Sequence, residues 1–239
     1  MRTLVIALLI LCPSLAAAQA PNPAGTILID DFESYREGAL PVKWKYLEDN
    51  NLVPLEPRLM RPREQWYVVA DGQNKAVRVY TEGEAVHLTM ANEAGGFNWD
   101  IRSLPRLAWD WRALRLPTGA NEDKEKTNDT GAAVYVIFSI DGLVFKRPKA
   151  IKYTYSSSLP VGTVATYGKL KVVVVSSALD GLGSWKPVVR DVAADYRRFF
   201  GEEPPARPLS VRLWGDSDNT GSIGEADFDN VRFLPPGSR

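Results

Sequence analysis

Short apolar runs recur along the whole chain, and clusters of Gly, Pro, Asn and Asp separate them. Aromatic and β-branched residues dominate these runs, and several alternate with a period of two, as "KYTY" (152–155) does. Short alternating segments of this composition are typical of strands. The runs cover residues 26–32, 66–70, 76–80, 107–114, 132–140, 150–156, 169–177, 209–214 and 226–234. The pattern predicts an all-β sandwich or barrel.

One segment, "RDVAADYRRFFGEEPP" (190–205), has helical periodicity instead. Its apolar side chains fall on one helical face, at Val192, Tyr196, Phe199 and Phe200. Asp191 can cap the start, and Gly201 can take the left-handed position after the end. We predict a short crossover helix over residues 191–200, packed on a sheet edge.

The first residues have the features of an export signal. Arg2 supplies a positive charge, an apolar run extends from Leu4 to Leu11, and small residues follow. This pattern predicts a signal peptide over residues 1–18, with cleavage after Ala18, and hence a periplasmic or secreted protein. Leu11 before Cys12 argues against lipidation. Cleavage removes this only cysteine, so we expect neither a disulfide nor a thiol nucleophile.

Charge and length limit the classes of partner. The chain has 29 Lys and Arg against 29 Asp and Glu, which argues against a nucleic-acid partner. No later stretch is apolar enough to predict a membrane span. We expect one domain over residues 26–235, and a monomer.

Catalytic motifs are scarce. His87 is the only histidine, which leaves too few ligands for zinc, and we expect it to be structural. We find no serine nucleophile elbow and no nucleotide-binding loop, and we expect neither a nucleotide nor haem. A glycosidase that uses two carboxylates stays open, because Asp110, Asp129 and Asp141 flank predicted strands and such pairs have no linear signature.

The stretch "DSDNTGSIGEAD" (216–227) is similar to an EF-hand calcium loop. Asp216, Asp218 and Gly221 match the template, and Asp227 stands where a glutamate is usual. Thr220 is a weaker ligand, and the flanking segments are predicted strands, which excludes a helix-loop-helix. Two interpretations stand: a calcium site, or a turn that uses ordinary turn residues.

A second pair of carboxylates offers another cation site. Asp229 is in phase with Phe233, and Asp31 is in phase with Ile29, so both are predicted to point inward. An inward carboxylate needs backbone N–H groups, an arginine or a cation beside it. Capping or ion pairing is the alternative to calcium here. The two candidate sites compete, because Asp227 and Asp229 share a phase on one strand.

Aromatic residues supply the candidates for ligand binding. Rows of Tyr or Trp on a flat strand face give glycan binders an apolar platform with polar handles. The candidate ligand-binding residues are Trp99, Arg112, Tyr153, Tyr155 and Trp185. Packing in the core is the alternative for each aromatic residue among them.

Two patches carry a resemblance to known families. "ILIDDFESY" (27–35) and "ADFDNVRFL" (226–234) resemble the first and last strands of jelly-roll carbohydrate-binding modules of the galactose-binding-like type. The resemblance implies that these strands lie side by side, with a structural calcium between them at Asp31, Glu33 and Asp229. The segments "LAWDWRALRLPTGANEDK" (107–124) and "RDVAADYRRFFGEEPP" resemble the bacterial exported family catalogued as domain of unknown function 3047, which implies an exported sandwich and no known activity.

The sequence therefore predicts an all-β, two-sheet jelly-roll sandwich with one short crossover helix. The favoured function is binding of a glycan or cell-envelope component by a non-catalytic protein that holds one structural calcium. One alternative is a glycan-active hydrolase or lyase that uses paired carboxylates. A second alternative is a periplasmic scaffold protein, which would show a large apolar surface patch.

Overall fold

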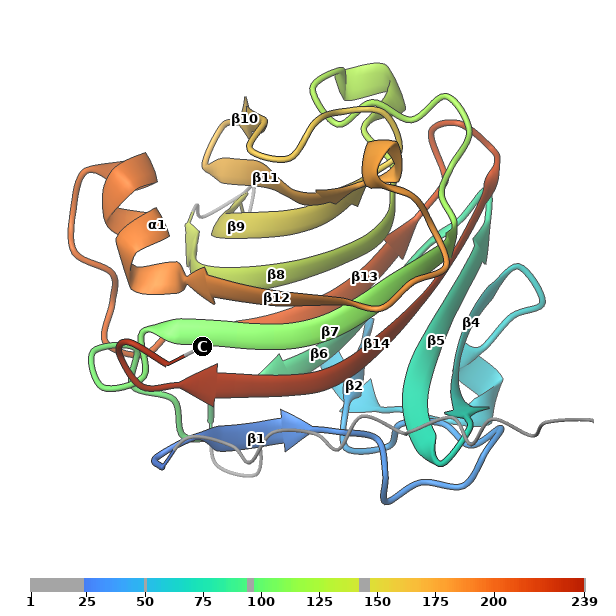
Figure 1. Cartoon of the computed structure of the whole chain (residues 1–239), viewed down its shortest axis with the longest axis horizontal. Helices are drawn as coiled ribbons and strands as arrows, with labels where there is room; N and C mark the ends of the chain where they lie inside the picture. Colours follow the sequence, from blue (N-terminus) through green and yellow to red (C-terminus); the bar gives the residue numbers. More distant parts are fainter. Residues whose placement is uncertain (1–23, 50, 94–96, 142–146, 239) are drawn as a thin grey trace, which may run out of the picture.

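The computed structural model describes residues 24–49, 51–93, 97–141 and 147–238 (Figure 1). The predicted signal peptide, residues 1–18, lies outside the described residues. Within the described ranges, no helix is both long and apolar enough to cross a membrane.

The smaller of two sheets has six strands and contains both ends of the folded chain. Its spatial order is β12 (Lys186–Asp191), β7 (Arg106–Arg115), β14 (Ile223–Leu234), β5 (Asn74–Glu82) and β4 (Glu64–Asp71), and β1 (Ile27–Asp30) also pairs with β14. Figure 1 shows β1, in blue, alongside β14, in red. The first and last strands therefore lie side by side, as the resemblance implies.

The larger sheet has eight strands. Its order is β10 (Val164–Tyr167), β11 (Leu170–Ser177), β9 (Arg147–Ser156), β8 (Thr130–Asp141), β13 (Ser210–Asp216), β6 (Ala85–Ala91), β2 (Lys45–Glu48) and β3 (Asn51–Pro54). Three short 3₁₀ turns span Pro57–Leu59, Glu125–Thr127 and Ala178–Asp180. The predicted two-sheet jelly-roll sandwich is confirmed.

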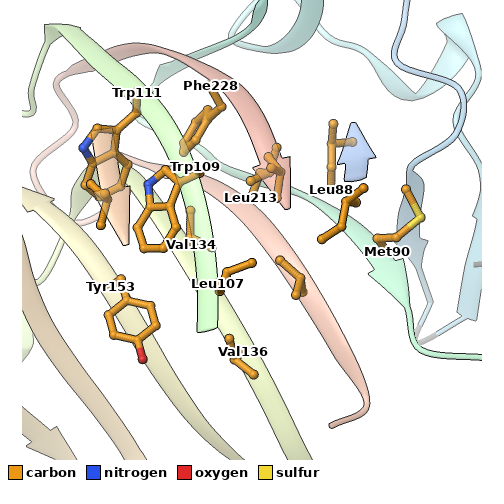
Figure 2. Packing of buried hydrophobic residues seen from close by; sticks show 14 of the residues in the cluster. Leu88, Met90, Leu107, Trp109, Trp111, Val134, Val136, Tyr153, Leu213 and Phe228 are labelled. Atoms are coloured by element: carbon orange, nitrogen blue, oxygen red, sulfur yellow. The ribbon is translucent and has the colours of Figure 1, made fainter. Parts of the chain in front are cut away.

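Alternation along the strands builds the core between the sheets. In β7, Trp109 and Trp111 point inward, and their rings meet edge to face with centroids 5.4 Å apart. From the facing sheet, Tyr153 packs 5.7 Å from Trp109, and Tyr155 packs 5.5 Å from Trp111 (Figure 2 shows Trp109, Trp111 and Tyr153). Buried aromatic rings of this size supply much of the area that stabilises a sandwich.

The predicted helix is confirmed as α1 (Val192–Phe200), with the expected ends. The Asp191 side chain accepts a hydrogen bond from the Ala194 N–H at 2.8 Å, and Gly201 has a left-handed φ of 71°. Tyr196 packs edge to face on Phe138 of β8, with centroids 4.5 Å apart.

Two β-bulges change which carboxylates point inward. In β1 the pairing register shifts between Leu28 and Asp30, so Asp30 is 1% exposed whereas Asp31 is only half-buried. In β14 the register shifts after Asp229, where Asn230 takes a positive φ of 52°. The inward direction predicted for Asp31 and Asp229 assumed an unbroken period of two, and a bulge inserts one residue into that period.

The loop between β7 and β8 lies on the outer face of the eight-stranded sheet. Its Glu122 carboxylate accepts a hydrogen bond from the Ser156 hydroxyl of β9 at 2.6 Å. Its Glu122 carbonyl accepts another from the Tyr167 hydroxyl at 2.7 Å. The loop therefore covers one end of this face, near the ends of β9 and β10.

Candidate functional site

The outer face of the eight-stranded sheet carries a row of polar side chains that crosses five strands. Neighbouring strands pair Lys45 of β2 with Thr89 of β6, Thr89 with Arg212 of β13, Arg212 with Tyr135 of β8, and Tyr135 with Lys152 of β9. Residues opposite one another in neighbouring strands share a face. The residues before and after Arg212, Val211 and Leu213, point into the core. We call these five residues the outer-face row.

Stacked aromatic rings lie beside this row. His87 and Trp214, which pair across β6 and β13, stack with ring centroids 4.3 Å apart and an angle of 3° between planes. The ring centroids of Tyr135 and Trp214 are 5.0 Å apart, and the Lys152 ammonium lies 5.6 Å from the centre of the Tyr135 ring. Trp214, Tyr135 and His87 are each half-buried. The three rings form an aromatic cluster, which we call the aromatic platform, with Trp214 between the other two rings.

Several buried polar atoms on this face have no hydrogen-bond partner. Among the described residues, four such side-chain atoms belong to the row or the platform: His87 Nε2, Thr89 Oγ1, Arg212 Nε and Trp214 Nε1. A buried donor or acceptor without a partner costs about 1–3 kcal/mol, so most folded proteins avoid it. These four atoms are gathered on one face, but each is buried, so a ligand reaches them only if the covering side chains move.

The two buried cations in the row differ in their surroundings. Burial lowers the pKa of Arg212, and no carboxylate among the described residues opposes this effect. For Lys152 burial also favours the neutral form, but Tyr135, Asp216 and Glu122 outweigh it and raise the pKa. Arg212 therefore lacks the carboxylates that compensate Lys152.

His87 is expected to stay neutral throughout the physiological range. Burial and then the charge of Arg212 lower its pKa from 6.5 to about 3. The unfolded chain binds a proton at His87 more tightly than the folded chain does. The contribution of neutral His87 to stability is therefore complete above about pH 6.5 and decreases as the pH falls toward 3. His87 is the single histidine, so its ring proton NMR signal should not shift between pH 8 and 5. A titration centred near pH 6.5 would contradict this environment.

Carboxylates gather at the Asp216 end of β13. Among the described residues, Asp129, Asp216 and Asp218 form a group whose ligand atoms lie within 4.8 Å of one another. Burial, opposed by Lys152 and reinforced by Asp218 and Asp129, raises the pKa of Asp216 to about 7. Asp129 also accepts hydrogen bonds from the Asn219 and Thr220 N–H groups, at 3.0 and 2.7 Å. The loop predicted from the EF-hand template thus gains Asp129 from a distant part of the chain.

The structural calcium stays a prediction, and a thermal melt tests it. If calcium joins these carboxylates, adding it should raise Tm by several degrees, and EDTA should reverse the rise. Asp218→Asn should remove most of the shift, whereas Glu33→Gln, at the competing site, should leave it unchanged. No calcium-dependent shift, and no calcium in the purified protein by elemental analysis, would refute the prediction.

The other predicted metal ligands lie apart from this group. Asp227 is buried on the outer face of the six-stranded sheet, where Arg78 and Arg112 hold it at 2.6 and 2.8 Å. Glu33 is exposed and accepts the Lys75 N–H at 2.7 Å. Asp31 accepts the Glu33 N–H at 3.2 Å. These contacts match the capping and ion-pairing alternative.

Asp229 lies beside Asp110, also on the outer face of the six-stranded sheet. The two residues pair across β14 and β7, and Asn230 Nδ2 bridges them at 3.1 and 2.9 Å. Burial raises both pKa values, that of Asp229 to about 7. Asp229 is 2% exposed and also accepts the Asn74 amide at 2.9 Å. This carboxylate pair is therefore enclosed by donors, which suits a structural role better than the glycosidase alternative.

The predicted ligand-binding residues fall in two places. Trp99, Tyr153 and Tyr155 are fully buried in the core, the alternative left open for each. Arg112 and Trp185 lie together on the outer face of the six-stranded sheet, with the guanidinium 4.9 Å from the ring centre. Trp185 donates to Asp71 at 2.7 Å, and Arg112 donates to the same carboxylate at 3.2 Å. The hydrogen-bond donors of Trp185 and Arg112 are therefore already bonded to carboxylates of the protein.

The outer-face row and the platform were not among the predicted site residues, yet the sequence carries a signal for them. In "LSVRLW" (209–214), Arg212 and Trp214 share the phase opposite to Val211 and Leu213. A tryptophan in the polar phase of a strand indicates a surface aromatic. Tyr135 shows the same signal between Val134 and Val136.

Comparison with protein families identifies the chain. The model of the family described as "Protein of unknown function (DUF3047)" matches residues 55–232. The chain belongs to this family. The match includes four of the five residues of the outer-face row, from Thr89 to Arg212, and omits Lys45. A search of curated proteins gives no match.

Solved structures with a similar arrangement include carbohydrate-binding modules from Clostridium thermocellum. A family 11 module of a cellulosomal cellulase has 11% identity and a TM-score of 0.44, and the alignment covers 90% of this chain and 96% of that one. A family 11 module in complex with a β-1,3-1,4-mixed-linked tetrasaccharide has 12% identity and a TM-score of 0.44, with 88% and 95% covered. A family 30 module of a cellulosomal cellulase has 10% identity and a TM-score of 0.42, with 89% and 99% covered.

Proposed function

We propose that this protein is an exported, non-catalytic glycan-binding protein whose binding surface is the outer face of the eight-stranded sheet. The observation that carries the proposal is the coincidence of an aromatic platform with unpartnered polar atoms. Sugars present apolar C–H faces and hydroxyl groups together, and half-buried aromatic rings beside half-buried basic side chains match both features.

The contacts on the two outer faces support this choice of surface. On the six-stranded sheet, Trp185 donates a hydrogen bond to Asp71, and Arg112 donates one to Asp227. On the eight-stranded sheet, Trp214 Nε1 and Arg212 Nε have no partner among the described residues. A ligand that reached these buried donors would gain hydrogen bonds on the second face without breaking any within the described residues, and the cost of desolvating the donors has already been met in folding.

The proposal is tested by affinity gel electrophoresis of the protein without its first 18 residues. Gels contain neutral or acidic polysaccharides one at a time, and insoluble envelope material is tested by sedimentation. At least one glycan should retard the protein relative to a non-binding standard, and reducing ends should not accumulate on prolonged incubation. Absence of binding to every glycan would overturn the binding function, and accumulation of reducing ends would overturn its non-catalytic part.

A further inference from the structure

We propose that the glycan bound by this surface is anionic, and that Arg212 contacts a sugar carboxylate such as that of a uronic acid. This inference rests on the proposed function and narrows its ligand to one class. It starts from the charges of the outer-face row, in which Lys45, Arg212 and Lys152 are basic and no member is acidic.

Arg212 differs from three other half-buried arginines of this chain in having no ion pair; Arg106 and Arg232 also have none, but Arg212 Nε is the only buried arginine nitrogen without a hydrogen-bond partner among the described residues. Arg78 and Arg112 both contact the Asp227 carboxylate, and Arg190 contacts Asp195 at 2.8 Å. Arg212 has no ion pair within the described part of the chain, and its Nε is buried without a partner. A half-buried guanidinium without a counterion is costly to fold, which indicates that its partner comes from outside the chain.

The chemistry of arginine selects the partner. Its planar guanidinium presents paired N–H donors that match the two oxygens of a carboxylate, and such charge-assisted bonds are about twice as strong as neutral ones. Trp214, next but one along β13, lies between His87 and Tyr135, so it would present its ring edge to the sugar while Arg212 holds the sugar carboxylate.

The spacing of the basic residues suits a repeating polymer. Lys45 lies two strands from Arg212 on one side, and Lys152 lies two strands away on the other. Since neighbouring strands are about 4.8 Å apart, Lys45 and Arg212 lie about 10 Å apart across the sheet, whereas Lys152 is buried and not accessible to a ligand. Asp216 and Glu122 partly compensate Lys152, so Arg212 and Lys45 carry most of the available positive charge. A polyanionic chain lying across the strands would contact both.

The test compares acidic glycans with their own neutral forms. Affinity electrophoresis and calorimetry are run with polygalacturonate, alginate and hyaluronan, with the carboxyl-reduced form of each, and with neutral glucans. We expect at least one acidic glycan to bind, and we expect carboxyl reduction to weaken that binding about tenfold or more. Equal binding of the acidic and reduced forms, or binding of neutral glucans alone, would overturn this inference and leave the proposed function intact. Binding of no glycan would overturn the proposed function itself.

Two variants test whether Arg212 is the residue that contacts the sugar carboxylate. Arg212→Gln should lose about tenfold or more in affinity for the acidic form and bind the reduced form as the unchanged protein does. Its Tm should be equal or higher, because no internal ion pair is lost. Arg102→Gln removes an arginine that is 71% exposed and should change neither affinity. Unchanged binding of the acidic form by Arg212→Gln would overturn the assignment. If the variant fails to fold, the carboxyl-reduced glycans still decide the proposal.

Discussion

Replacing Trp214 by Ala is expected to lower the affinity for a bound glycan by about 30-fold or more. Truncating an aromatic residue at the centre of an interface commonly costs about 2 kcal/mol or more, which corresponds to that factor. Trp214 holds the centre of the platform, because it stacks on His87 at 4.3 Å and lies 5.0 Å from Tyr135. Its loss removes the central ring of the cluster and also the unpartnered Nε1–H donor.

Trp185→Ala is the matched control for this experiment. Trp185 is also half-buried and lies on the outer face of the other sheet, where it packs on Arg112. Isothermal titration calorimetry on both variants should show the loss for Trp214→Ala only, and thermal melts should show that both variants are folded. The reverse result, a loss for Trp185→Ala alone, would move the site to the six-stranded sheet.

Replacing Asp227 by Ala is expected to cause the largest loss of stability among single changes of charged residues. Asp227 is fully buried, and its two oxygens accept hydrogen bonds from Arg78 at 2.6 and 3.0 Å and from Arg112 at 2.8 Å. Removing one partner of a buried ion pair costs about 3–5 kcal/mol, and we expect the lower end of this range because Arg78 keeps Glu225 and Arg112 keeps Asp71 as second partners. Urea denaturation should show a decrease of this size in the free energy of unfolding.

An exposed ion pair provides the comparison for Asp227. Glu203 contacts Arg197 at 3.2 Å, and its side chain is 77% exposed. Glu203→Ala should therefore change stability by less than about 1 kcal/mol. A loss below about 1 kcal/mol for Asp227→Ala would show that the two arginines find other partners or reach solvent. Affinity for glycan should stay unchanged in any Asp227 variant that folds, because Asp227 lies on the opposite face from the platform.

The period of the apolar residues was sufficient to predict the architecture. Alternation predicted the strands, and the capped segment at 191–200 predicted α1, because both signals arise from neighbours in sequence. Carboxylate directions were less predictable, since they depend on whether a strand is regular. One bulge places Asp30 rather than Asp31 inside, and another places Asp229 on the outer face. A bulge shifts the phase by one residue and leaves no clear mark in composition.

The candidate site depends on pairing between distant strands, which sequence spacing does not reveal. Tyr135 and Arg212 become neighbours only because β8 pairs with β13, and Asp129 joins Asp216 for the same reason. The sequence could show that Trp214 occupies a polar phase, but not that His87 stacks on it. Prediction from composition selected Tyr153 and Tyr155 instead, which the same pairing places in the core.

The most direct measurement of the central claim is an NMR titration of the tryptophan indole N–H signals with a bound glycan. Trp214 Nε1 has no partner within the described part of the chain, whereas Trp185 Nε1 donates to Asp71 at 2.7 Å. The signal that disappears in Trp214→Ala should shift progressively as glycan is added, and the signal that disappears in Trp185→Ala should stay in place. A stationary Trp214 signal under saturating glycan, with the Trp185 signal shifting instead, would contradict the assignment of the binding surface to the eight-stranded sheet.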